Sequence, residues 1–327
     1  MKYTWERAFA DGREAALVGE GSERMLDAYR KLLFDGAQPA AFIEAPLLGR
    51  SGYDVVMILQ GDRCYPGCKL HNETQTQAQA MIDWVAGLEN TRPDMFFEFD
   101  ASGSGKLAGV HCKIEGRLEL AESFFNALGE PQRTASFIGT AERLPEGWIC
   151  LYAAAFPGRQ ISTTRMEILI FGKEARRLVG DAEYLKECFE HLGYRAYDGQ
   201  MLREAAQIAA IGVPVTMQFD LGSDGSISPC FSLLSNYEHA RSNFRQLFGE
   251  NGALNRTCRI YEKMGIADER WQLIEKSCFA VKCTLLTAEG IADRVNRCLP
   301  CCTKVKWKSP DRRAAKFYLM LDSQRVD

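Results

Sequence analysis

Several short segments of the chain alternate apolar and charged residues, a spacing that gathers charged side chains on one face of a β-strand. In the segment 95–100 (MFFEFD), Glu98 and Asp100 share a face opposite Phe97 and Phe99. Other strands add further candidates to such a face, namely His111, Lys113, Tyr152, Arg165, Glu167, Asp220, Lys304, Lys306, Lys316 and Tyr318. Clustered lysine and arginine side chains are suited to binding a polyanion such as a diphosphate.

Glu44 is the one charged residue in the apolar stretch 42–48 (FIEAPLL). A carboxylate in such a strand is costly to bury unless it has a partner or a function. Because a carboxylate can take a proton from a reacting group or orient that group, Glu44 is the candidate catalytic residue. Tyr152 and Tyr318 would add hydroxyl donors and aromatic faces that can shield a cation.

The charged side chains share one face only if their segments form β-strands, and the sequence predicts five β-hairpins. In each hairpin, two alternating segments flank a centre rich in Gly, Ser, Asp or Pro, the residue types that tight turns require. The paired segments are 40–48 with 53–60, 95–100 with 107–115, 148–156 with 162–171, 215–221 with 227–234, and 303–308 with 315–321.

Amphipathic helices are expected between the hairpins, because apolar residues recur there every three and four positions. The predicted helices cover 22–36, 74–88, 119–130, 181–194, 198–211, 236–250, 253–265 and 267–279. The stretch 278–286 is ambiguous between helix and strand.

The alternation of helices and hairpins is compatible with two architectures. An open sheet of ten antiparallel strands with all helices on one side would curl, and closing it into a barrel removes both sheet edges. The predicted fold class is therefore α+β, a ten-stranded antiparallel barrel inside an outer ring of helices, formed by a single domain over 1–327. The alternative is two open α+β sandwiches, in which the polar face would simply be exposed to solvent.

The composition argues against several function classes. The chain has 327 residues, a net charge of −3 and a pI near 6.0, so nucleic acid is not an expected partner. No apolar run approaches the roughly 18 residues needed to cross a bilayer, and no membrane partner is expected. The first residues contain no apolar signal region, and 12 cysteines in such a chain are typical of reduced thiols in the cytosol.

Several segments of the chain resemble one family of enzymes. FIEAPLL, FFEFD followed by GVHCKI, the helix EYLKECFEHLGY, and the closing stretch from RWQLIEKSCF to AKFYLML are similar to segments of the ABBA-type soluble prenyltransferases. Within this family the chain looks most like the cyanobactin-type peptide prenyltransferases, which act on ribosomally made peptides. The aromatic small-molecule branch is a close alternative, because GSISPCF is similar to one of its hairpins.

This resemblance implies transfer of a dimethylallyl or geranyl group from its diphosphate to a peptide side chain or an aromatic acceptor. It implies Glu44 as the base or orienting group, Mg²⁺ as the expected cofactor, and no organic cofactor. The residues expected to bind the diphosphate are Lys113, Arg165, Lys304, Lys306 and Lys316. The side chains expected to hold Mg²⁺ or a cationic acceptor are Glu98, Asp100, Glu167 and Asp220, and His111 is a further substrate-binding candidate.

Two other interpretations stay open. Cys64 and Cys68, together with Cys298, Cys301 and Cys302, include ligand-like spacings for a structural zinc site, although the two groups lie far apart in the sequence. The chain could also be a non-catalytic peptide-binding accessory protein. An enzyme of the predicted kind should bind an isoprenyl diphosphate, whereas such an accessory protein should not.

Overall fold

In the computed structural model, all described strands belong to one antiparallel sheet of eleven strands. The structure describes residues 40–49, 54–61, 64, 76–89, 92–100, 107–157, 163–237, 244–287 and 290–325. The helix predicted over 22–36 lies outside these residues. The strands are β1 (Ala40–Pro46), β2 (Asp54–Leu59), β3 (Met95–Asp100), β4 (Leu107–Lys113), β5 (Trp148–Ala155), β6 (Thr164–Ile170), β7 (Val215–Leu221), β8 (Ile227–Asn236), β9 (Phe279–Thr287), β10 (Gly290–Ser309) and β11 (Arg312–Arg325).

Strands β10 and β11 close the sheet into a barrel. Strands β1 to β8 pair in chain order, β11 pairs with β1, and β10 pairs with both β8 and β11, so ten strands form a ring. At the closure, Tyr318 of β11 lies opposite Glu44 of β1 on one side and Cys302 of β10 on the other. The closed barrel that the hairpin pattern predicts is therefore confirmed. The alternative of two open sandwiches is wrong, because the first and last strands of the ring pair with each other.

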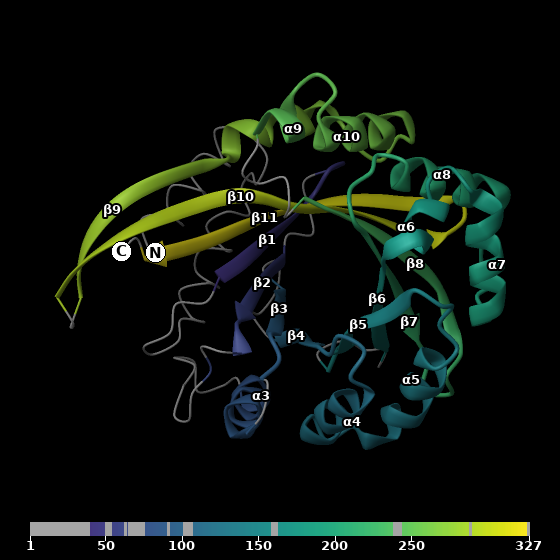
Figure 1. Ribbon diagram of the computed structural model, residues 1–327, viewed down its shortest axis with the longest axis horizontal. Coiled ribbons are helices and arrows are strands. Elements are labelled where there is room, and N and C mark those ends of the chain that lie inside the picture. Colours follow the sequence, from purple (N-terminus) through teal and green to yellow (C-terminus); the bar gives the residue numbers. More distant parts are fainter. Residues whose placement is uncertain are drawn as a thin grey trace.

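Strand β9 resolves the ambiguity over 278–286 in favour of a strand. It pairs with the first part of β10, from Gly290 to Cys298, whereas β8 pairs with the later part, from Cys302 to Trp307. The last hairpin is consequently longer than predicted, with 20 residues in β10 and 14 in β11. Figure 1 shows β9, β10 and β11 extending past the rest of the barrel on the left.

Helices surround the strands on the outside (Figure 1). They are α3 (Thr76–Gly87), α4 (Leu118–Ala127), α5 (Thr134–Ala141), α6 (Gly172–Arg177), α7 (Ala182–Leu192), α8 (Gly199–Ala209), α9 (Phe244–Phe248) and α10 (Ala253–Lys263). Asp181 and Asp198 cap α7 and α8 by accepting hydrogen bonds from the backbone N–H groups of Tyr184 and Met201. None of the described helices is long and apolar enough to span a membrane.

Two of the predicted helices differ from the structure. Of 236–250, Asn236 belongs to β8 because it pairs with Cys302, and the described α-helix covers only Phe244–Phe248. The stretch 267–279 forms 3₁₀ turns over Glu269–Leu273 and Glu275–Ser277 instead of an α-helix. Its buried residues, Trp271, Ile274 and Ser277, recur every three positions, which matches the 3₁₀ period.

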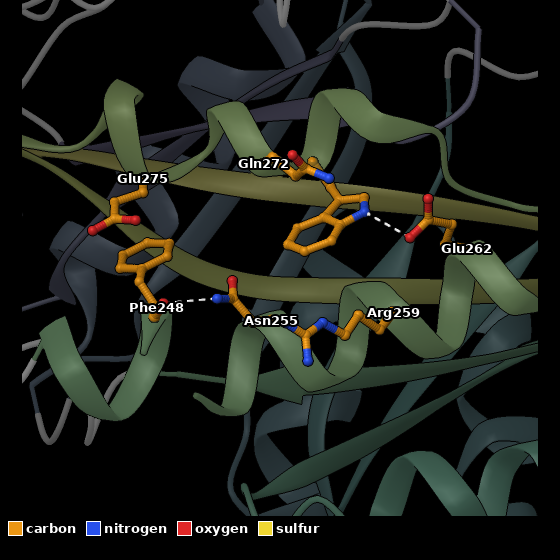
Figure 2. Close-up of a pocket in the computed structure, with 7 residues that line it drawn as sticks. Phe248, Asn255, Arg259, Glu262, Gln272 and Glu275 are labelled. Carbon is orange, nitrogen blue, oxygen red and sulfur yellow. Dashed lines mark hydrogen bonds between the residues drawn. The ribbon is translucent and has the colours of Figure 1, made fainter. Parts of the chain in front are cut away.

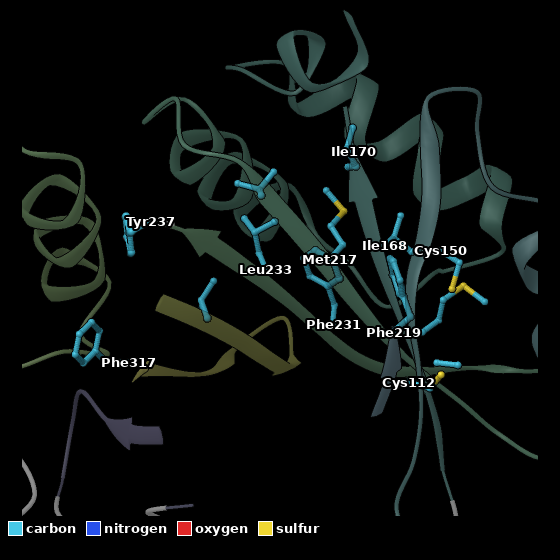
Figure 3. Close-up of a cluster of buried hydrophobic side chains, with 14 of the residues drawn as sticks. Cys112, Cys150, Ile168, Ile170, Met217, Phe219, Phe231, Leu233, Tyr237 and Phe317 are labelled. Atoms are coloured by element: carbon cyan, nitrogen blue, oxygen red, sulfur yellow. The ribbon is translucent and has the colours of Figure 1, made fainter. Parts of the chain in front are cut away.

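The main hydrophobic core lies between the outer face of the strands and the helices. Phe97 and Phe99, which the alternation places on one face of their strand, are each 1% exposed. In Figure 3, Phe219 and Phe231 lie together on β7 and β8. Phe189 of α7 meets both rings edge-on, with centroid distances of 5.8 and 5.0 Å. This packing fixes strand register, because a shift by one residue would turn the apolar side chains inward.

The packing of the outer core predicts that substitutions of two neighbouring residues of β10 differ strongly in their effect on the free energy of unfolding. Trp307 is fully buried, stacks on Phe231 at 5.4 Å and donates a hydrogen bond to Glu204. We expect Trp307→Ala to lower the free energy of unfolding by about 3–5 kcal/mol in urea titrations, because it leaves a cavity. Lys308 is exposed, so Lys308→Ala should change the free energy of unfolding by no more than about 0.5 kcal/mol. Equal effects of the two changes would contradict this assignment of inner and outer faces.

Candidate functional site

The inner face of the barrel encloses a cavity of about 590 Å³, here called the lumen, to which all ten strands of the ring contribute side chains. The sequence-predicted site residues that line it are Glu44, Glu98, His111, Lys113, Tyr152, Arg165, Glu167, Lys304, Lys306, Lys316 and Tyr318. Asp220 is buried beside it and binds Arg165. Asp100 ends β3, and its side chain lies outside the described part of the chain.

Glu44 is buried at the seam between β1 and β11. Its two carboxylate oxygens accept hydrogen bonds from the ammonium group of Lys316 and the hydroxyl of Tyr318. Burial alone would raise the pKa of Glu44, but the positive charges of Lys316 and Lys304 hold it below its ordinary value. Burial and the charge of Glu44 raise the pKa of Tyr318. At neutral pH the seam therefore presents an ionised carboxylate beside a protonated phenol.

Arg165 and Asp220 form a buried pair across β6 and β7. The guanidinium donates from Nε to Oδ1 at 2.7 Å and from Nη2 to Oδ2 at 3.2 Å, and it lies 4.6 Å from the centroid of the Phe156 ring. Lys306 adds its charge at 3.8 Å from Oδ2. Burial would raise the pKa of Asp220, yet Arg165 and Lys306 lower it to about 2. Arg165 thus has one edge on Asp220 and one face on Phe156, and because it also lines the lumen, its predicted role in binding the diphosphate stays a prediction.

Lys304 is buried among other cations near the centre of β10. It is 7% exposed, and among the described residues no carboxylate forms an ion pair with it. Burial, together with the positive charge of Arg165, lowers its pKa to about 7. A dianion entering the lumen would restore the charged form of Lys304, because an opposite charge favours ionisation. The lysine is therefore well suited to an anionic ligand.

Three weaker polar contacts complete the lumen. The Nε2 atom of His111 lies 3.5 Å from Oε2 of Glu98. Lys113 pairs with Glu115 at 2.8 Å near solvent. Gln218 lies on the polar face of β7, and its Nε2 atom donates a hydrogen bond of 2.7 Å to Oε2 of Glu167.

An aromatic wall, formed by Phe42, Phe96 and Tyr152, stands beside these charges. Phe42 stacks on Phe96 with a centroid distance of 6.1 Å, and Phe96 meets Tyr152 edge-on at 5.1 Å. Phe42 and Phe96 are not among the sequence-predicted site residues. Alternation alone could have found them, because each lies two positions before a candidate carboxylate, Glu44 or Glu98.

The cysteines that the structure describes do not assemble the zinc site considered above. Cys301 and Cys302 line the lumen, but Cys298 lies in the outer core, since residues three apart on a strand point to opposite faces. Cys64 donates a hydrogen bond to a backbone carbonyl on α3, and Cys68 lies outside the described residues. Within the described chain, no three His, Cys, Asp or Glu side chains are placed to hold a metal ion.

A second cavity, of about 530 Å³, lies between α9, α10 and the 3₁₀ turns (Figure 2). Trp271 donates a hydrogen bond of 3.3 Å to Glu262, and Asn255 donates one of 2.7 Å to the backbone of Phe248. None of the sequence-predicted site residues lines this cavity. The lumen is therefore the candidate active site.

The lowered pKa of Lys304 predicts a pH dependence of stability. Between about pH 7 and 10 the unfolded chain still binds a proton that the folded protein has lost, so stability should rise with pH. We expect the difference in free energy of unfolding between the wild type and Lys304→Met to grow in favour of the wild type, by up to about 1.4 kcal/mol per pH unit. Urea titrations from pH 6 to 10 measure it, and a constant difference would contradict the assignment.

Comparison with known proteins supplies the fold family. No protein-family model matches the chain, and no curated protein matches it in sequence. Among solved structures, 5-dimethylallyltryptophan synthase from Streptomyces coelicolor is similar with a TM-score of 0.57 and 13% identity, over 98% of this chain and 96% of that one. A structure of that synthase with DMASPP and Trp gives the same score and identity, over 98% and 94% of the two chains.

A third similar structure is PriB in a binary complex with product diphosphate. Its TM-score is 0.54 at 11% identity, over 98% of this chain and 95% of that one. At such identities the similarity shows the fold. The chain therefore has the ABBA-type barrel fold that its sequence resemblance implies.

Proposed function

We propose that the protein transfers a dimethylallyl or geranyl group from its diphosphate to a nucleophilic acceptor bound in the lumen. The observation that carries the proposal is the pairing, in one cavity, of a lysine-rich strand with an ionised carboxylate and an aromatic wall. The similar structures support this proposal, because the synthase is in complex with DMASPP and Trp and PriB is in complex with product diphosphate.

The lysines of β10 would hold the diphosphate. Lys304, Lys306 and Lys308 alternate along one strand and all face the lumen. As the allylic C–O bond breaks, its electron pair passes to the diphosphate, and these cations stabilise the developing negative charge. Arg165 would keep Asp220 from neutralising them.

The allylic fragment becomes positively charged as the diphosphate leaves. Tyr152, Phe96 and Tyr318 present aromatic surfaces that can stabilise this charge and keep water away from it. A carbon or heteroatom of the acceptor then forms the new bond and loses a proton. Glu44, ionised and held by Lys316 and Tyr318, would orient the acceptor and receive that proton.

Two acceptor classes fit this lumen. An aromatic small molecule agrees with the Trp bound in the structure of the similar synthase. A peptide side chain is the acceptor that the cyanobactin-type resemblance implies, and it stays a prediction, as does the cytosolic location. A transfer assay with free tryptophan and with peptides containing Tyr, Trp or Arg would separate the two classes.

Magnesium also stays a prediction. The described carboxylates of the lumen have protein partners, as Glu44 has Lys316 and Asp220 has Arg165, and they do not form a three-ligand set for an ion. A divalent ion would therefore be held mainly by the oxygens of the diphosphate.

The lysine-rich strand predicts binding of isoprenyl thiodiphosphates, which resist transfer. Dimethylallyl or geranyl thiodiphosphate at one hundred times its Kd should stabilise the protein by about 2.7 kcal/mol, seen as a rise in Tm with and without Mg²⁺. Lys306→Met should weaken binding about tenfold or more, because hydrogen bonds to charged groups contribute about 1.5–3 kcal/mol. Lys263→Met, an exposed change on α10, is the matched control. No shift at millimolar ligand would favour the non-catalytic alternative.

The position of Glu44 at the seam predicts an effect on the rate of transfer that is separate from diphosphate binding. Glu44→Gln keeps the size of the side chain but removes the base, so transfer should slow by about a hundredfold or more. Binding of the thiodiphosphate should be retained, because Glu44 is not one of its ligands. Product formation under single-turnover conditions, followed by chromatography, measures the effect. Full transfer activity in this variant would rule out the role of Glu44.

A further inference from the structure

A second polar cluster lies in the lumen on β6 and β7, which are neighbours in the barrel wall (Figure 1). It consists of Glu167, Gln218 and Thr216, all of which line the cavity. Gln218 lies directly opposite Glu167 in the ladder, and Thr216 lies opposite Leu169 in the next pair on that face. The mechanism above does not use these three side chains.

The hydrogen bonding of this cluster is incomplete. Gln218 is 6% exposed and Thr216 is 2% exposed, yet Oε1 of Gln218 and Oγ1 of Thr216 have no hydrogen-bond partner among the residues that the structure describes. The orientation of the Gln218 amide follows from its neighbour, because a carboxylate only accepts hydrogen bonds and must face the NH₂ group. The amide oxygen is thus left as a buried acceptor that lacks a donor, which is costly without a ligand.

The charge of the cluster is also uncompensated. Glu44 pairs with the charge of Lys316, and Asp220 pairs with that of Arg165. Glu167 has the Gln218 amide, but no cationic side chain in the described part of the chain forms an ion pair with it. A carboxylate and an amide oxygen accept hydrogen bonds, and a hydroxyl can accept one, so the three side chains together favour a ligand that donates hydrogen bonds and carries positive charge.

The carboxylate of the cluster lies on a different part of the wall from the diphosphate site, whereas Gln218 and Thr216 of β7 are two strand spacings, about 10 Å, from Lys306 and Lys304. Along one ladder row, Tyr152 pairs with Glu167, Glu167 with Gln218, Gln218 with Ser232, and Ser232 with Lys306. Glu167 is therefore three strand spacings from Lys306 along the wall, about 14 Å. It adjoins Tyr152, the last ring of the aromatic wall.

We propose that Glu167, Gln218 and Thr216 bind a protonated amine or a guanidinium group of the acceptor substrate. The assignment of this cation to the acceptor rests on the proposed function, whereas the cation site itself does not. A flat acceptor would lie against Tyr152 and Phe96, with its cationic end on β6 and β7. The acceptors favoured by this lumen are then aromatic amines or peptides with a nearby ammonium or guanidinium group.

Binding of matched probe pairs, by calorimetry on the full chain at pH 7, tests the proposal. The pairs are tryptamine with 3-ethylindole, tyramine with 4-ethylphenol, and 2-phenylethylguanidine with 2-phenylethylurea. We expect at least one cation to bind tenfold or more tightly than its neutral partner. Glu167→Gln, which retains an acceptor for the Gln218 amide, should abolish this preference and leave the affinity for the neutral member unchanged.

Two further variants make the result specific. Gln218→Leu removes the unpartnered amide oxygen and should also reduce the preference for the cation. Glu142→Gln makes the same charge change at an exposed position outside the barrel lumen and should leave the preference intact. Because each readout is a ratio of two affinities, general loss of folded protein would not imitate the expected result.

The outcomes separate this inference from the proposed function. No preference for the cation in any pair, including no binding up to 10 mM, overturns the inference, and so does a preference that survives in Glu167→Gln. Titration of dimethylallyl thiodiphosphate on the same samples tests the proposed function independently. Preference for the cation without thiodiphosphate binding would keep the cation site and remove prenyl transfer.

Discussion

The pairing of β10 with both β8 and β11 is the constraint on which the rest of the structure depends. It joins the last strands of the chain to the first, and it leaves no open edge within the ring. A closed antiparallel ring of ten strands is too wide for its own side chains to fill, so an inner cavity follows from strand number. The helices bury the apolar outer face, and the register that this burial fixes turns the polar alternate positions inward.

An enclosed polar face must balance its own charges, and this explains most of the contacts in the lumen. Glu44 with Lys316 and Tyr318, and Asp220 with Arg165, satisfy groups that would otherwise be costly to bury. Lys304 is left with a pKa of about 7, and Glu167 is left without an ion pair among the described residues. Breaking such a pair would destabilise the protein, because it would leave one charge buried alone, whereas groups without a countercharge gain most when a ligand arrives.

Much of this arrangement follows from strand alternation. The spacing of Glu98 and Lys113 predicts that their side chains share the inner face, and the structure confirms it. Alternation cannot predict partners, because Glu44 and Lys316 are 272 positions apart and meet only when the barrel closes. It also fails at irregularities: the register shift between Pro300 and Cys302 lets Cys301 and Cys302, adjacent in sequence, both line the lumen.

Two parts of the lumen wall have opposite charge, the lysines of β10 and Glu167 of β6, and this affects how ligands are arranged within the cavity. A diphosphate is attracted to β10 and repelled by Glu167, whereas a cationic group is attracted to β6 and β7 and repelled by Lys304 and Lys306. The low-dielectric walls between them strengthen both preferences. These two parts of the wall therefore select ligands of opposite charge, which would hold a transferable group and its acceptor together in the lumen, near the aromatic wall and Glu44. Positioning of this kind lowers a barrier by supplying orientation before the reaction begins, and it requires no movement of the barrel.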